Sequence, residues 1–166
     1  MLFIITREKM SDTSLIGRCG LYCGHCSIHR AYKDSERLRG EFAKLYGCTP
    51  EEIKCDGCQT VNGYSWCKEA KWGKNCKMIK CLDSKGLTYC NECPEFDTCA
   101  MFNEFAADNL KIGVDVKVNL AAIKCKKPEE WLSEQEKIWR CRECGNPVIN
   151  SELVKSCHWC GAKVTF

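Results

Sequence analysis

The chain has 166 residues, and 17 of them are cysteine. This density in so short a chain indicates either a disulfide scaffold or a set of metal sites. The formal net charge is +3 with neutral thiols, but a zinc ion held by four thiolates carries about −2, so three such sites would bring the total to about −3. The charge therefore gives no reason to expect a nucleic-acid-binding protein.

Residues 1–14 carry no clear element and are predicted to form a flexible N-terminal extension. The apolar run at residues 2–5 is too short for the core of a signal peptide, and charged residues follow it at once. No other run is apolar and long enough to span a membrane. We therefore expect a cytoplasmic protein, with no membrane partner, whose reduced thiols are metal ligands rather than cystines.

The densest group of cysteines comes next. Cys19, Cys23 and Cys26 lie within eight residues and are separated by glycines. His25 and His29 lie four residues apart, as two metal ligands on a helix can. Because the nearby thiols already suffice as ligands, we interpret both histidines as ordinary surface or core residues.

The spacing of apolar residues predicts several short helices. Proline and glutamate after Thr49 mark a capped turn, and Asp97 is expected to cap a later helix. The predicted helical segments cover residues 27–46, 49–52, 98–107, 115–125 and 128–139. Many of their aromatic and aliphatic residues are expected to form the core.

Nine more cysteines lie before residue 100, and the seven that are candidate ligands are Cys55, Cys58, Cys76, Cys81, Cys90, Cys93 and Cys99. The Cys55–Cys58 pair with its interior glycine is typical of a zinc knuckle. One predicted four-thiol set is Cys23, Cys26, Cys55 and Cys58, which leaves Cys19 as an exchange partner. The second set is Cys76, Cys81, Cys90 and Cys93, with Cys99 as the alternative fourth ligand. Spacing alone does not fix this connectivity.

Lysines recur from residue 68 to residue 85, and Trp66 and Trp72 lie close to them in the sequence. A basic, aromatic face can bind single-stranded nucleic acid. The simpler interpretation is that lysines near thiolates lower the thiol pKa and offset the negative charge. Nucleic acid is therefore an alternative partner but not the favoured one.

The last 26 residues contain a second kind of pattern. Cys141, Cys144, Cys157 and Cys160 form Cys-x2-Cys-x12-Cys-x2-Cys, with a glycine after each pair. Residues 148–149 and 163–166 are expected to form short strands. The pattern predicts a zinc ribbon, in which four protein ligands close the metal shell and leave no position for chemistry. So short a segment cannot bury a core, so metal binding is expected to supply its folding energy.

With these motifs in view, the chain resembles the cysteine-rich prokaryotic proteins catalogued as a domain of unknown function, which are common in anaerobic bacteria and methanogenic archaea. The matching motifs are CGLYCGHC at 19–26, CDGC at 55–58, Cys76 with Cys81, CNECPEF at 90–96 with Cys99, and WLSEQEK at 131–137, followed by the ribbon. The resemblance covers roughly residues 15–166 and implies metal binding, but it brings no assigned reaction. Cys48, Cys67 and Cys125 lie outside the pattern and are interpreted as free buried thiols.

Together these observations predict a small, metal-stabilised α+β protein. Its expected parts are a flexible extension (1–14), a cysteine-rich metal-binding domain with several short helices (15–127), a connecting helix (128–140) and a zinc ribbon of short β-strands (141–166). We expect about three zinc ions, since twelve to fourteen thiols fill about three four-ligand shells.

The favoured function is a non-enzymatic interaction module that binds zinc and an unknown protein partner. The alternative is an iron–sulfur protein for electron transfer or sensing, because Cys19, Cys23 and Cys26 have the spacing of radical S-adenosylmethionine enzymes. The chain is too short for the partial barrel of that enzyme class, so only a cluster without that chemistry remains. Thiol–disulfide chemistry would need a thioredoxin-like unit, which the sequence does not predict.

Overall fold

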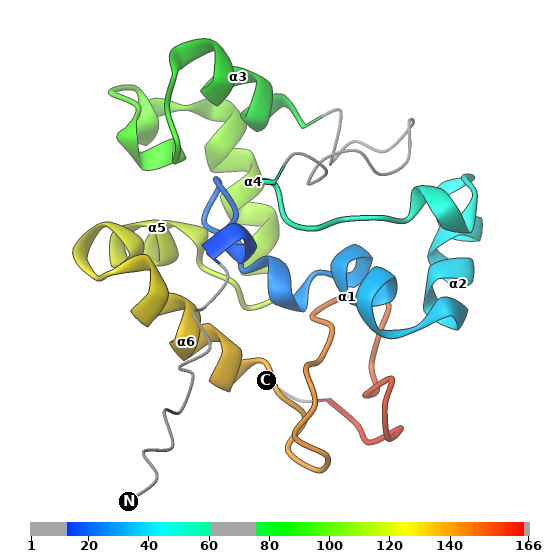
Figure 1. Cartoon of the computed structure of the whole chain (residues 1–166). Coiled ribbons are helices and arrows are strands. Elements are labelled where there is room, and N and C mark those ends of the chain that lie inside the picture. The colour runs from blue at the N-terminus through cyan, green and yellow to red at the C-terminus, as the bar shows by residue number, and fades with distance from the viewer. Residues whose placement is uncertain (1–12, 61–75, 165–166) are drawn as a thin grey trace, which may run out of the picture.

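The computed structural model describes residues 13–60 and 76–164, which form a small and mostly helical protein (Figure 1). In these residues the α-helices are α1 (Ser27–Asp34), α2 (Glu36–Tyr46), α3 (Lys77–Lys85), α4 (Ala100–Leu110), α5 (Val116–Cys125) and α6 (Pro128–Ile138). Short 3-10 turns are η1 (Thr13–Leu15), η2 (Cys23–His25), η3 (Pro50–Glu52), η5 (Cys90–Glu92) and η6 (Phe96–Thr98). The prediction of several short helices is confirmed.

The helix predicted over residues 27–46 is in fact two helices. Ser35 has an extended backbone (φ −157°, ψ 116°) between α1 and α2, and its hydroxyl accepts a hydrogen bond from the Leu38 amide. A serine in this role caps a new helix rather than continuing the previous one. The apolar spacing predicted helix on both sides of the break, and Gly47 ends α2 as predicted, but Leu45 of the predicted apolar face is 57% exposed.

Three other predicted segments agree closely with the structure. The η3 turn has the predicted capping box at Thr49 and Glu52, and α5 and α6 match their predicted ranges within a residue. The side chain of Asp115 caps α5 by accepting hydrogen bonds from two backbone amides. The α4 helix begins later than predicted, because Cys99 and not Asp97 is its N-cap residue.

Helix α3 was not predicted. Its lysines were interpreted as counter-charges for thiolates, with a basic nucleic-acid face as the alternative. Met78, Ile79 and Leu82, which have helical spacing, are buried in α3. Residues 61–75, which include Trp66, Cys67, Trp72 and the lysines before α3, lie outside the described part of the chain. The basic-face prediction can therefore be compared with the structure only at α3.

The buried side chains form two groups. The larger group joins α3, α4, α5 and α6, with Phe102, Leu120 and Trp131 at its centre. The smaller group lies between α1, α2 and η3, and includes Ile28, Phe42 and Ile53. Two adjacent C-terminal residues bridge them, because Val148 packs in the larger group and Ile149 in the smaller one.

The C-terminal segment contains isolated β-bridges in place of the predicted strands. The bridges within residues 140–164 pair Arg140 with Pro147, Ser151 with Val154, and Ser156 with Lys163. This segment, coloured orange to red in Figure 1, lies beside α1. The predicted boundaries of the four parts of the chain remain a prediction.

Candidate metal centre

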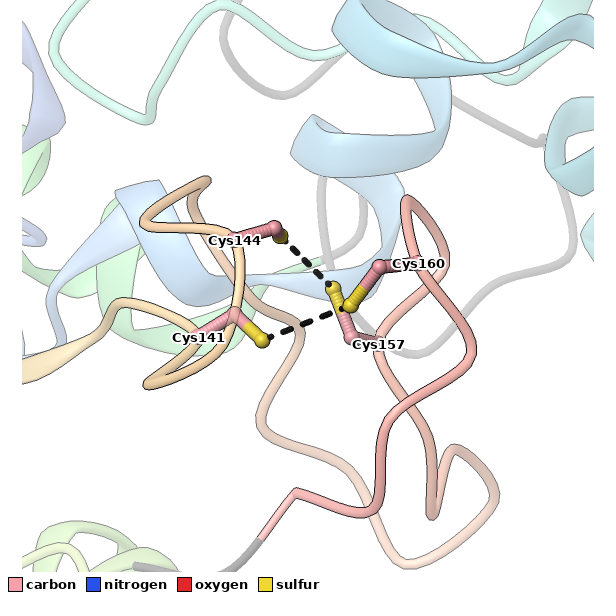
Figure 2. A group of neighbouring side chains, drawn as sticks. All are labelled: Cys141, Cys144, Cys157 and Cys160. Carbon is pink, nitrogen blue, oxygen red and sulfur yellow. Dashed lines mark hydrogen bonds between the residues drawn. The ribbon is translucent and has the colours of Figure 1, made fainter.

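Two cysteine pairs in the C-terminal segment converge on one point. Figure 2 shows that Cys141 and Cys144 come from one loop, that Cys157 and Cys160 come from another, and that the four sulfurs face each other. All four Sγ atoms lie within 4.8 Å of one another. The Sγ atoms of Cys141 and Cys160 are 3.7 Å apart, and so are those of Cys144 and Cys157. A tetrahedral ion with four sulfurs at about 2.3 Å requires about 3.8 Å between them. This group can therefore hold a metal ion.

The two loops have the same backbone hydrogen bonds. In each loop the first cysteine's carbonyl accepts from the glycine four residues later, at 2.9 Å from Gly145 and 2.8 Å from Gly161. In each loop the first cysteine's amide donates to the carbonyl five residues later, at 2.9 Å to Asn146 and 2.7 Å to Ala162. The Cys144 amide bonds to the Cys141 sulfur and holds the pKa of that thiol at about 7. Amides that point at sulfur favour the thiolate, which is the form that binds metal.

Buried polar contacts join this segment to the helices. His158 Nε2 is 3.0 Å from a carboxylate oxygen of Asp34, at the end of α1, and both side chains are almost fully buried. The Asn150 amide donates to the His25 carbonyl at 3.0 Å, and the Asn150 side chain donates to the Ile112 carbonyl at 3.3 Å. The four-cysteine group is thus held against the helical body.

The other ten predicted ligands line two separate cavities. The larger cavity, of about 620 Å³, is lined by Cys19, Cys23, Cys26, Cys55, Cys58 and Cys76. The smaller one, of about 270 Å³, is lined by Cys81, Cys90, Cys93 and Cys99. Within residues 13–60 and 76–164, only the C-terminal four sulfurs gather within 4.8 Å of one another. The assignment of these ten cysteines as ligands therefore remains a prediction.

In the larger cavity the sulfurs of Cys23 and Cys58 are joined by a hydrogen bond, which lowers the pKa of Cys58 to about 7. The Arg18 amide also donates to the Cys58 sulfur, at 3.3 Å. Burial raises the pKa of Cys19 and raises that of Cys55 to about 12. A cation bound here would reverse those two shifts, because it stabilises the thiolate directly.

In the smaller cavity a lysine faces the thiols. Lys85 Nζ donates to the Cys93 sulfur at 3.2 Å and to a carboxylate oxygen of Glu95 at 2.6 Å. Burial raises the pKa of Cys90 to about 12, and the neighbouring sulfur that adds most to this shift is that of Cys99. Lys85 is placed where it would offset the charge of bound thiolates, which was the interpretation of the lysines in this region.

Three α-helices begin at cysteines of these cavities. Cys26, Cys76 and Cys99 are the N-cap residues of α1, α3 and α4, and each has an extended backbone. Serine, threonine, aspartate and asparagine are the usual residues at this position. The helix N-terminus favours a negatively charged sulfur. Because cysteine is not one of the usual cap residues, the sequence did not predict these three caps.

Both histidines of the N-terminal region are buried. His29 Nδ1 is 2.9 Å from the Cys55 carbonyl oxygen, which explains its place in the core. His25 lines the larger cavity and packs against Trp139 with ring centroids 4.4 Å apart. Among the residues that the structure describes, neither nitrogen of the His25 ring has a hydrogen-bond partner. Burial lowers the pKa of His25 to about 4, so the ring is neutral at pH 7.

The cysteines outside the motifs differ from the expectation. Cys125 is exposed and Cys48 is half-buried, while Cys67 lies outside the described residues. The prediction that Cys125 is buried was wrong, because it is the last residue of α5 and is followed by exposed lysines. All cysteines of the described ranges are free of disulfides.

A family model described as "Protein of unknown function (DUF3795)" matches residues 15–104. The chain belongs to this family. The DUF3795 match includes all ten N-terminal candidate ligands and ends within α4, before the four-cysteine group. No curated protein matches the chain, and no solved structure does either. None of the helices in the described ranges has the length and apolar character needed to cross a bilayer.

Proposed function

We propose that the chain is a cytoplasmic zinc protein in which Cys141, Cys144, Cys157 and Cys160 hold a structural zinc ion. The observation that carries this proposal is the arrangement of the four sulfurs, with two separations of 3.7 Å. Zinc accepts four thiolates at that spacing, and a shell of four protein ligands has no position for a substrate. The ten cysteines of the DUF3795 region bind further metal, to a total of about three centres if each takes about four thiolates.

A closed shell leaves no position for chemistry at this metal, so we propose a binding module rather than an enzyme. Two large apolar side chains near the four-cysteine group are exposed, Leu153 at 67% and Trp159 at 46%. The Trp159 indole donates to the Pro147 carbonyl at 3.1 Å, so the ring is fixed in place. A fixed, exposed tryptophan is typical of a surface that contacts another protein. A protein partner is thus part of the proposal.

The test is the metal content of the full chain, purified without oxygen. Zinc, iron and sulfide per chain are measured in the wild type, in Cys141→Ser and in Cys125→Ser. We expect Cys141→Ser to lose one zinc and the exposed Cys125→Ser control to lose none. Equal zinc in all three proteins would contradict the C-terminal zinc site.

A second candidate is an iron–sulfur cluster in the larger cavity, with Cys19, Cys23 and Cys26 among its ligands. The observation in its favour is that the six sulfurs of this cavity do not gather as closely as the C-terminal four. In a [4Fe–4S] cluster each thiolate binds its own iron, so the sulfurs lie further apart than around a single ion. The surrounding cavity of about 620 Å³ has room for a cluster.

The substitution Cys19→Ser separates the two candidates for the larger cavity. A single zinc ion is complete with four of the six thiols, so the variant should keep its zinc. A cluster that uses Cys19 should be lost, or should bleach in air. A brown wild-type protein that loses iron and sulfide on this one change would favour the cluster.

A further inference from the structure

Resting on the proposed metal binding, we infer that Cys81, Cys90, Cys93 and Cys99 form a separate four-thiolate metal centre. Cys76 then belongs to the other set, with the cysteines of the larger cavity. This replaces the pairing expected from spacing, in which Cys76 was a ligand of this set and Cys99 only its alternative. The centre takes a thiolate-preferring metal, either a zinc ion or the irons of a cluster.

The two cavities divide the ten cysteines without overlap. Cys81, Cys90, Cys93 and Cys99 line only the smaller cavity, and the other six line only the larger one. Met78 lines both cavities and is buried, so its side chain lies between them. Four thiols around a space of about 270 Å³ are enough to complete one metal shell.

Helix α3 explains why Cys76 and Cys81 line different cavities. An α-helix turns by about 100° per residue, so positions five residues apart point about 140° away from each other and lie about 7.5 Å apart along the axis. Cys76 caps the start of α3, and Cys81 lies within it. One helix therefore delivers these two sulfurs to different cavities.

A series of tight turns brings Cys90, Cys93 and Cys99 to the smaller cavity. Cys90 begins the η5 turn, and Cys93 ends it by donating its amide to the Cys90 carbonyl at 3.2 Å. The Phe96 amide then donates to the Cys93 carbonyl at 3.0 Å, and the Cys99 amide to the Phe96 carbonyl at 3.3 Å. These successive turns bring three cysteines of one short segment around the cavity that Cys81 faces from α3.

A charged side chain belongs to this centre alone. Lys85 lies four residues after Cys81, on the same face of α3, and donates to the Cys93 sulfur at 3.2 Å. The positive charge of Lys85 reduces the repulsion among four neighbouring thiolates. Lys85 lines the smaller cavity and not the larger one. Lys85 is therefore a residue through which one centre can be changed without the other.

Arg18 lies at the boundary between the two sets. Its amide donates to the Cys58 sulfur at 3.3 Å, while its carbonyl accepts from the Cys90 amide at 3.0 Å. Its guanidinium is paired with Asp83 of α3 and donates to the Leu87 and Thr88 carbonyls. The backbone at Arg18 thus touches one set on each side.

The test compares Cys99→Ser with its matched variant Cys76→Ser in the full chain. Both proteins are purified without oxygen, treated briefly with N-ethylmaleimide, and digested, so that each cysteine's modification is read from its own peptide. Zinc, iron and sulfide per chain are measured in parallel. Zinc loss identifies the centre as a zinc site, and loss of iron with sulfide identifies it as a cluster.

We expect Cys99→Ser to lose the metal of one centre and to expose Cys81, Cys90 and Cys93 to alkylation, while Cys23 and Cys58 stay protected. Cys76→Ser should leave Cys81, Cys90, Cys93 and Cys99 protected. The inference is overturned if Cys76→Ser exposes Cys90 and Cys93, or if Cys99→Ser leaves them protected.

A milder variant keeps the test decisive if Cys99→Ser fails to fold. Lys85→Met retains every thiol, so we expect a chelator to remove metal faster from the Cys81–Cys99 set while Cys23 and Cys58 keep their wild-type protection. Equal release rates would count against the inference. Failure of the proposed function looks different, because the Cys141 and Cys160 peptides would then be alkylated already in the wild type.

Discussion

The two ends of this chain hold their cysteines in different ways. In the C-terminal segment the four sulfurs converge within 4.8 Å, and two loops with matching hydrogen bonds carry them. In the DUF3795 region ten sulfurs are spread around two cavities, on helix starts, turns and helix interiors. The first arrangement is complete within one short segment. The larger cavity takes its cysteines from segments far apart in the sequence, and the smaller one needs α3 beside the η5 turn, so both are built only when these elements pack.

This difference teaches where local sequence is enough to define a metal site. A loop that places two sulfurs by its own backbone hydrogen bonds needs no help from tertiary structure. A sulfur on a helix is placed by whatever the helix packs against. Substitutions in the two regions should therefore differ in both the size and the reach of their effects.

The largest effect is expected for Cys157→Ser. Cys157 is only 2% exposed and is one of four convergent cysteines, so its substitution should remove the metal proposed for this group. Loss of a structural metal should destabilise the protein by more than about 4 kcal/mol. We expect metal analysis to show that the metal of the DUF3795 region is retained, and thermal unfolding to begin at the C-terminal segment. Loss of all metal would show that the two regions fold as one unit.

A smaller effect is expected for Gly57→Ala, within the Cys55–Cys58 loop. A Cβ atom at Gly57 would lie 2.2 Å from the Ser14 carbonyl oxygen, and the backbone there has φ +103°. We expect a cost of about 3 kcal/mol, because the backbone must move. The matched control is Gly145→Ala in the C-terminal loop, where φ is +71° and no atom lies within 4 Å. Its cost should be about 1 kcal/mol. Equal costs in urea unfolding would contradict tertiary support of the first loop.

A smaller loss of stability is expected when the contact between Asp34 and His158, which joins the two regions, is broken. Asp34→Ala removes the buried partner of His158 and leaves its imidazole nitrogen without a hydrogen bond. We expect a cost of about 1–3 kcal/mol. The control is Glu41→Ala, which breaks an exposed pair with Arg37 and should cost under about 1 kcal/mol. If the two variants unfold at the same urea concentration, the contact does not hold the regions together.

The smallest effect is expected for Cys125→Ser. Cys125 is exposed and lines neither cavity. Its substitution should change the free energy of unfolding by less than about 0.5 kcal/mol and leave metal content unchanged. A measurable loss of metal would mean that the set of ligands extends beyond the family motifs.

The sequence predicted the features that are set by local residues, and it did not predict those that depend on how the helices pack. The spacing of Cys141 to Cys160 was enough to identify a group that the structure brings together, because each loop is local. Helix α5 was also predicted, because Val116, Leu120 and Ile123 have helical spacing and are buried. The break at Ser35 was missed because the apolar spacing continues across it, and only the cap at Ser35 reveals it.

The grouping of the N-terminal cysteines could not be read from spacing. Cys76 and Cys81 look like one pair in the sequence, yet α3 turns them toward different cavities. Helix α3 itself was overlooked in favour of its lysines, so the rotation that separates the two sulfurs could not be considered. The role of Lys85 beside Cys93 likewise depends on how α3 packs against the η5 turn.

The cysteines at the starts of α1, α3 and α4 have a consequence for how the chain folds. These helices have only 8, 9 and 11 residues, and isolated helices shorter than about 12 residues are marginal in water because the first turn is costly to form. If Cys26, Cys76 and Cys99 bind metal as proposed, each bound ion would fix the residue at which a helix begins. Metal uptake would then lower the cost of nucleating that helix.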